Sequence, residues 1–294
     1  MTILVAALVG LALTALATWC TTGSKARRAA GVMLGVAVLV PPWFVPEGLP
    51  ILRGVWALAA FTTTMRIVDL SRTNWPLRER AVHAMSTIDS RRLVKITPRV
   101  HVAALVRALA WCALAAAGFF ALRVESSWVA RWAAGGVIAY AGVSALYEGL
   151  ALAYAATGFE TPPLHLSPLV SRTVQELWGE RWARPINEWL RDTLFRPLAR
   201  RRRPLVGLVL AFAVSAAFHA YAVWVALGLV RGLAMAGWMF AYFVAQAAVM
   251  ILERALRVTR WPAWAAHVWT VSWMLATAPL FVEPVVRVLF AQVR

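Results

Sequence analysis

Long apolar runs constrain what this chain can fold into more than any other feature. Eight of them approach or exceed the roughly 17 to 25 residues that a helix needs to cross a bilayer, and they lie at about 3–20, 29–45, 50–70, 101–122, 132–157, 205–230, 233–252 and 263–290. Hydrophobic residues form 61% of the chain and charged residues only 15%, whereas soluble domains are apolar over roughly half of their residues. The sequence therefore predicts an all-α integral membrane protein with about eight transmembrane helices.

The sequence shows no sign of a cleaved leader, a disulfide framework or a repeat. No basic segment precedes the first run and no small-residue cleavage pattern follows it before Lys25, so we interpret it as a retained span. Cys20 and Cys112 fall in or beside separate apolar runs without the spacing of metal ligands. We expect one domain over residues 1–294.

The positive charge of the chain is concentrated in alternate loops. Lys and Arg number 30 against 13 Asp and Glu, which gives a formal net charge of +17. Most of these cations fall in four loops of the eight-span order, at 24–28, 71–100, 159–203 and 254–260. By the positive-inside rule these loops face the cytoplasm, which places both termini on the other side of a bacterial inner membrane or its equivalent. Short basic loops between spans need no nucleic acid as a partner.

The loop at 159–203 carries a periodic aromatic pattern. Trp178, Trp182 and Trp189 recur at steps of four and seven, while arginines occupy other positions. This spacing predicts amphipathic interfacial helices that lie on, or dip into, the cytoplasmic face of the membrane. Pro185 is expected to bend or interrupt them.

A single histidine interrupts the apolar run 205–230. His219 follows the basic block 200–203 and has apolar residues on both sides. Lipid offers no water to solvate an imidazole, so an ionisable residue at this depth faces a protein interior or a wet cavity and commonly marks a functional site. A structural histidine, hydrogen-bonded to Ser215 or to a neighbouring helix, is the alternative.

The loop and the histidine together resemble a known family. The motifs, in a core at 170–228, are Leu177-Trp-Gly-x-Arg-Trp182, Trp189-Leu-Arg-Asp192, Phe195-Arg-Pro197 and Val214-Ser-x-x-x-His219. This order resembles the membrane-bound O-acyltransferases and, among them, the wax-synthase-like branch. The resemblance implies that His219 is the catalytic residue.

One position departs from the family pattern. Directly after the second tryptophan the family usually has Asn or His, and this chain has Ala183. Asn187 lies four residues on, which is the same face one turn away if the helix continues. We therefore interpret Asn187 as the replacement for the missing amide. An altered or inactive site is the alternative that Ala183 leaves open.

The resemblance implies transfer of a fatty acyl group from acyl-coenzyme A, as a co-substrate, to the hydroxyl of a lipophilic alcohol, without a cofactor. His219 would act as the general base, and Ser215 could orient its ring or donate to the oxyanion. Arginines would bind the coenzyme A phosphates, although anchoring to membrane lipid headgroups explains them as well. The residues expected to bind substrate are Trp178, Arg181, Trp182, Trp189, Arg191, Asp192 and Arg196, with Arg184 and 200–203 as further cations.

Two questions stay open from the sequence alone. A non-catalytic transporter or scaffold that keeps the fold is the alternative function, although a transporter would be expected to show repeated halves or paired broken helices. The acceptor is equally open among a wax-type alcohol, a sugar, a sterol-like alcohol, a glycerolipid and a secondary metabolite, because no residue pattern selects among them.

Other polar residues have weaker patterns. Glu148 is expected either to pair with Arg66 or Arg107 or to line a substrate channel, and Arg66 could instead pair with Asp69. His267, among several tryptophans, is interpreted as part of an aromatic belt at the membrane boundary. The remaining histidines fall in or beside loops and are expected at the surface; they are His83, His101 and His165.

Overall fold

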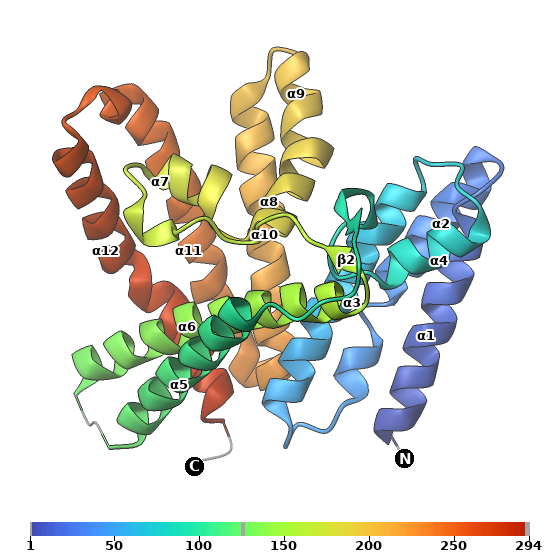
Figure 1. The fold of residues 1–294 in the computed structure, drawn as a ribbon, viewed down its shortest axis with the longest axis horizontal. Coiled ribbons are helices and arrows are strands. Elements are labelled where there is room, and N and C mark those ends of the chain that lie inside the picture. Colours follow the sequence, from blue (N-terminus) through green and yellow to red (C-terminus); the bar gives the residue numbers. More distant parts are fainter. Residues whose placement is uncertain (1, 125–126, 292–294) are drawn as a thin grey trace. The chain divides into compact units, whose positions relative to one another are not determined.

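The computed structural model describes residues 2–124 and 127–291, and most of this part of the chain is helical (Figure 1). Seven of its helices are long and apolar enough to cross a membrane, which confirms an all-α integral membrane protein. They are α1 (Thr2–Cys20), α3 (Pro50–Leu70), α5 (Val102–Val124), α6 (Trp128–Ala156), α10 (Pro204–Leu227), α11 (Leu229–Leu256) and α12 (Ala263–Leu289).

Shorter elements connect these helices. Those before α6 are α2 (Lys25–Ala37), η1 (Pro41–Phe44), α4 (Leu77–Met85), η2 (Ser90–Arg92) and the strand β1 (Val94–Lys95). Those after α6 are β2 (Phe159–Glu160), η3 (Pro168–Val170), α7 (Val174–Glu176), η4 (Leu177–Arg181), α8 (Arg184–Leu190), η5 (Arg191–Phe195), α9 (Arg196–Arg200) and η6 (Val258–Arg260).

The apolar run 29–45 does not form a helix of spanning length. Its helix, α2, has 13 residues and ends at Ala37. Pro41 and Pro42 follow and open the 3₁₀ helix η1, because a proline has no N–H for the helical ladder and its ring clashes with the preceding turn. The seven helices of spanning length in the described residues agree with the expected total of about eight. Hydropathy overstates the run 29–45, because it registers the apolar residues of this run but not its prolines.

The helices form two compact units, which we describe separately. The first contains residues 1–91, 217–237 and 287–294, and the second contains residues 92–216 and 238–286. Helix α10 contributes to both units, because its residues up to Ala216 belong to the second and the rest, including His219, belong to the first.

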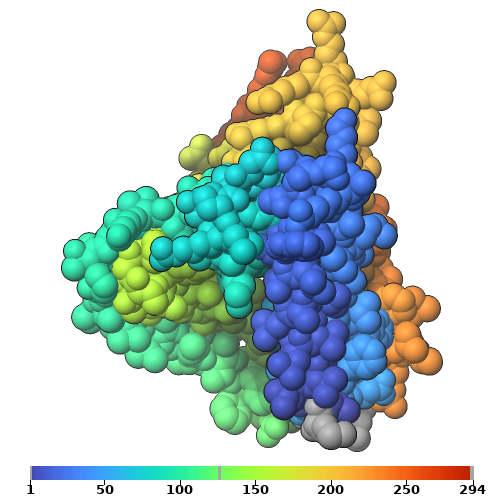
Figure 2. Space-filling view, turned by 90° about the vertical axis from the view of Figure 1, so that its right-hand side faces the viewer, coloured from blue at the N-terminus to red at the C-terminus, as the bar shows by residue number. Residues whose placement is uncertain are grey.

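In the first unit, α2 packs closely against α1 and α3 through glycines. A Cβ atom at Gly31 would lie 2.7 Å from the side chain of Thr21, and one at Gly35 would lie 2.8 Å from the side chain of Ile67. Any side chain would collide at these positions, so glycine is required. Pro41 then packs beside Gly10, so the chain from α2 to η1 runs back along α1. Figure 2 shows the outer face of α1, in dark blue, where leucines are exposed as expected beside lipid.

In the second unit, α5 and α6 pack against each other as a hairpin. β1 and β2 form a short antiparallel pair in which Val94 lies opposite Glu160. A separate hydrophobic core contains Val174, Val249 and Met250, and Trp178 packs against it. This core holds the start of the motif-bearing loop against α11.

The basic loops meet in pairs within each unit. In the first unit, Arg28 donates to the carbonyl of Ser71 at 3.1 Å, so loops 24–28 and 71–100 share one end. In the second unit, Glu253 accepts from the backbone N–H groups of Val174 and Gln175 at 2.8 and 3.1 Å, which brings loop 159–203 to the end of α11 where loop 254–260 begins. This pairing agrees with the alternation of basic loops along the sequence.

Candidate active site

The motif-bearing loop is a series of short helices in the second unit. α7 continues into the π-helical turn η4, and after a break α8 continues into a second π-helical turn, η5, and then α9. Such turns occur frequently at functional sites. The break lies at Ala183, whose φ of 43° is left-handed. Pro185 lies in the first turn of α8, where a missing N–H costs little, so the expected interruption occurs two residues earlier than Pro185 and has a different cause.

The tryptophans of the motif are half-buried and connect the loop to α11. Nε1 of Trp178 donates to Oε1 of Gln246 at 3.3 Å. The ring of Trp178 lies 5.7 Å from that of Phe243 and 6.3 Å from that of Trp182. Trp189 is half-buried as well. The break at Ala183 separates Trp189 from the other two, so the three rings do not lie along one continuous helix.

The arginines of the loop motifs form ion pairs with nearby carboxylates. Arg184 with Glu188 and Asp192 with Arg196 are four residues apart on helices, a spacing from which the sequence alone could have predicted ion pairs. The side chains of residues 200–203, by contrast, are exposed and make no ion pair with a carboxylate in the described part of the chain. The closest pairs are Arg181 with Glu176 (2.6 Å), Arg184 with Glu188 (3.1 Å), Arg196 with Asp192 (2.6 Å) and Arg191 with Asp192 (3.9 Å).

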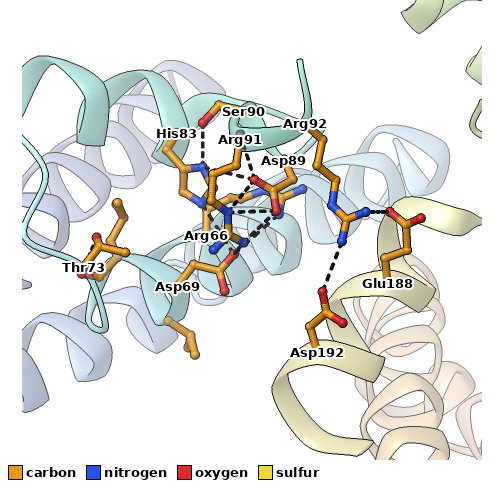
Figure 3. Close-up of polar contacts among 12 residues, drawn as sticks. Arg66, Asp69, Thr73, His83, Asp89, Ser90, Arg91, Arg92, Glu188 and Asp192 are labelled. Carbon is orange, nitrogen blue, oxygen red and sulfur yellow. Dashed lines mark hydrogen bonds and ion pairs between the residues drawn. The ribbon is translucent and has the colours of Figure 1, made fainter. Parts of the chain in front are cut away.

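A further arginine, which the motifs did not indicate, completes this network. Arg92 donates to Glu188 at 2.6 Å and to Asp192 at 3.1 Å (Figure 3). Elsewhere in the loop, burial raises the pKa of the Glu176 carboxyl, but hydrogen bonds from the Arg172 N–H and from Arg181 outweigh burial and hold that pKa below its usual range. The carboxylates of Glu176, Glu188 and Asp192 are therefore already paired with arginines.

Asn187 and Ala183 are related by one helical turn. The backbone N–H of Asn187 donates to the carbonyl of Ala183 at 3.1 Å, as the first turn of α8 requires. The side-chain amide of Asn187 donates across the break to the carbonyl of Gly179. Because α8 begins directly after Ala183, the one-turn relation needs no continuous helix across the break, and the amide of Asn187 joins α8 to η4.

His219 lies two thirds of the way along α10 in the first unit and is half-buried. Its ring centroid lies 4.7 Å from that of Phe218, which lies 4.1 Å from that of Phe61 on α3. Tyr221, two residues on, donates its hydroxyl to the carbonyl of Leu39. Ser215, one turn before His219, is buried. The imidazole thus lies on α10 beside the aromatic side chains of Phe218 and Phe61.

Two loop histidines that we expected at the surface are buried or half-buried. His83 is fully buried; its Nδ1 lies 2.8 Å from Oγ of Ser90, and its Nε2 lies 3.5 Å from a carboxylate oxygen of Asp69 (Figure 3). His165 is half-buried between aromatic rings, 4.6 Å from Tyr147 and 4.7 Å from Trp182. The surface prediction is therefore wrong for both, because the side chains that cover them belong to other elements of the fold. It is correct for His101, which is exposed.

The structure also places the other polar residues that the sequence singled out. Arg107 on α5 forms a bidentate pair with Glu148 on α6, at 2.7 and 3.1 Å, which confirms the pairing option for Glu148. Arg66 lies 3.7 Å from Asp69. His267 is half-buried, and its Nδ1 lies 2.9 Å from the carbonyl oxygen of Ser171.

Comparison with known protein families gives a match over the motif-bearing loop, α10 and part of α11. Residues 161–244 match the model of the membrane bound O-acyl transferase family. The matched segment contains the short helices of the loop, Ala183, Asn187 and His219. No curated protein matches the chain. The match and the seven apolar helices support a membrane O-acyltransferase in general and a multi-pass integral membrane protein.

Proposed function

We propose that this protein transfers a fatty acyl group from acyl-coenzyme A to the hydroxyl of a lipophilic alcohol, as in the wax-synthase-like branch of the family. The observation that carries the proposal is the family match over residues 161–244, which contains a half-buried imidazole on a helix of spanning length. The order of the tryptophan and arginine motifs before that helix supports the branch.

In the proposed reaction His219 is the general base. Its neutral ring removes the alcohol proton as the alcohol oxygen attacks the thioester carbonyl carbon, and a tetrahedral oxyanion forms. The carbon–sulfur bond then breaks, the ester leaves, and the thiolate of coenzyme A takes the proton from the imidazolium. Ser215, one turn away, is proposed to orient the ring, and Asn187 to stabilise the loop through its bond to Gly179.

The phosphates of the donor need cations that are not already neutralised. Because carboxylates pair with Arg181, Arg184 and Arg196, we assign phosphate binding to the exposed residues 200–203. This assignment places loop 159–203 in the cytoplasm, where acyl-coenzyme A is available, and it agrees with the positive-inside rule. Because the chain from α2 to η1 returns along α1 in addition to the seven spanning helices, the same rule assigns both termini to the opposite side.

A non-catalytic membrane protein is the second candidate. The observation that favours it is Ala183, which offers no polar side chain at the position where family members carry an amide or an imidazole. This candidate predicts a protein that keeps the fold and binds lipid without forming a product.

The test is an assay of the purified protein with radiolabelled acyl-coenzyme A and a panel of alcohols. We expect a labelled ester, and we expect His219→Ala to reduce its formation about a hundredfold to ten-thousandfold, the usual effect of losing a general base. His101→Ala, which changes an exposed histidine, is the matched control and should retain activity. Wild-type rates in His219→Ala would exclude His219 as the base, and no ester from any alcohol would favour the non-catalytic candidate.

A further inference from the structure

His165 is held opposite the motif tryptophan by a short antiparallel pairing of two loop segments. The N–H of Leu166 donates to the carbonyl of Arg181 at 3.0 Å, and the N–H of Arg184 donates to the carbonyl of Leu164 at 3.2 Å. These two bonds flank His165 on one segment and Trp182 with Ala183 on the other. The guanidinium of Arg181 also donates to the carbonyl of Leu166 at 2.7 Å. The position of His165 is therefore fixed by the backbone and does not depend on the ring itself.

Aromatic side chains surround the imidazole. Its centroid lies 4.7 Å from Trp182 with the planes tilted by 39°, and 4.6 Å from Tyr147 in an edge-on arrangement. Tyr140 lies 5.6 Å from Trp182, and Trp111 lies 5.6 Å from Tyr140. We call these five residues the aromatic cluster. It is built from α5, α6 and the loop of the second unit, and its rings are half-buried, so contact with hydrocarbon suits them.

One polar atom of this cluster is left unsatisfied. Nε2 of His165 is buried and has no hydrogen-bond partner in the described part of the chain. A buried polar atom without a partner costs about 1–3 kcal/mol and needs an explanation. Nε2 of His83 is in the same state but lies 3.5 Å from the carboxylate of Asp69. The carboxylate of Glu148, which acts on the ring electrostatically, is paired with Arg107. An atom held in this state on a fixed backbone is ready to bond to a ligand.

The chemistry of the ring selects among ligands. Burial lowers the pKa of His165 from 6.5 to about 4, against the opposing effect of Glu148, so the ring is neutral in the cytoplasm. A neutral ring in an apolar setting does not bind phosphate or carboxylate well. A hydroxyl group can donate and accept, and it therefore satisfies Nε2 in either tautomer of the imidazole.

We propose that Nε2 of His165 binds the hydroxyl group of a lipophilic alcohol whose hydrocarbon part packs on the aromatic cluster. The role of this alcohol as the acyl acceptor rests on the proposed function, whereas its binding does not. Within the proposed reaction His165 is a substrate-binding residue.

The test measures binding without catalysis. The protein is placed in lipid nanodiscs, and binding of tritiated hexadecanol is measured with empty nanodiscs subtracted, with unlabelled hexadecanol or hexadecane as competitors. The variants are His165→Phe, which keeps an aromatic ring but removes the nitrogen, and His165→Gln, whose amide lies near the position of Nε2. His101→Phe is the matched control, because it makes the same change at an exposed histidine of the same unit.

We expect His165→Phe to weaken hexadecanol binding about tenfold, the effect of losing one buried hydrogen bond, and to leave competition by hexadecane unchanged. His165→Gln should recover most of the affinity, and His101→Phe should bind as the wild type does. Equal hexadecanol affinity in His165→Phe, or an equal loss for hexadecane, would overturn the proposal, since the ring would then act through packing alone or satisfy Nε2 with water.

Kinetics separate this proposal from the proposed function. If the protein is an acyltransferase, His165→Phe should raise the KM for the alcohol and leave that for acyl-coenzyme A unchanged. If binding depends on the hydroxyl group but no ester forms, the proposed alcohol site stands and the proposed acyltransferase function is rejected. Ester formation with a KM for the alcohol that is unaffected in His165→Phe would retain the enzyme and reject the site.

Discussion

His83 and His165 have similar settings in the sequence and opposite settings in the structure. Each lies outside the apolar runs, in a stretch with prolines and polar residues. His83 is buried among charges, with Asp69 and Asp89 within 4 Å, whereas His165 lies between Tyr147 and Trp182. The first ring is one member of a network of ions, and the second is isolated in an apolar setting.

The difference shows that the partners of a buried polar group determine whether the group stabilises the fold or is available to bind a ligand. In the first unit, Arg91 donates to Asp89 at 2.6 Å and to Asp69 at 3.0 Å (Figure 3). Burial raises the pKa of the Asp89 carboxyl, but the hydrogen bonds from Arg91 outweigh burial and hold that pKa below its usual range. The charges of the His83 network thus offset one another and serve stability, with Nε2 of His83 3.5 Å from a carboxylate oxygen of Asp69 although it forms no hydrogen bond in the described residues. Nε2 of His165 lies among aromatic rings and forms no ion pair in the described residues, which suits it to binding a neutral group.

The largest expected effect tests the network of ions around His83. Asp69→Asn removes the charge that lies 3.7 Å from the fully buried Arg66 and 3.0 Å from Arg91. Removing one partner of a buried ion pair typically costs about 3–5 kcal/mol, so the thermal unfolding midpoint in detergent should fall strongly. Glu160→Gln, in the exposed pair with Arg99, is the control and should cost less than about 1 kcal/mol. Equal midpoints for the two variants would show that the network does not stabilise the fold.

A smaller effect, which depends on pH, tests the burial of the His165 ring. The unfolded chain protonates His165 below pH 6.5, but the folded chain does so only near pH 4. The folded state therefore loses stability through this ring as the pH falls from 6.5 to 4. His165→Phe lacks the titrating group, so the stability of the wild type relative to this variant should fall over that window. Unfolding midpoints at pH 7.5, 6 and 5 measure it, with His101→Phe as control; a constant difference would contradict the burial of a neutral ring.

The smallest effect extends the comparison to arginines. Arg200→Gln with Arg201→Gln removes two exposed cations that have no carboxylate partner in the described residues. If they bind the donor, the KM for acyl-coenzyme A should rise about two- to fivefold, as expected for exposed ionic contacts, and added salt should have the same effect on the wild type. Arg260→Gln, at another exposed site, should change nothing. An unchanged KM for the donor would assign the pair to lipid anchoring.

Composition predicts the fold of this chain well, because the cost of placing backbone and charge in lipid leaves few alternatives. The Glu148 pair with Arg107 follows from the same cost, since two opposite charges in adjacent spans satisfy each other. Local backbone chemistry was harder to anticipate. The prolines that end α2 occupy two positions in an otherwise apolar run, and the left-handed Ala183 has no sequence signature.

The candidate site was predicted in part. The motifs identified the loop and His219, and the family match covers both. Helical spacing could have indicated that Glu188 and Asp192 neutralise the nearby arginines. No local pattern could have indicated Arg92 or His165. The partners of Arg92 lie far along the chain, and the rings beside His165 belong to other elements, so only the folded loop brings them together.

The shortness of α2 bears on how the protein enters the membrane. At 13 residues, with Lys25, Arg27 and Arg28 in its first turn, this helix is far below the length that inserts independently. Its glycines fit only against side chains of α1 and α3. We therefore expect the first three helices to leave the translocation machinery as one assembled group, with α1 waiting beside α2 until α3 has been synthesised.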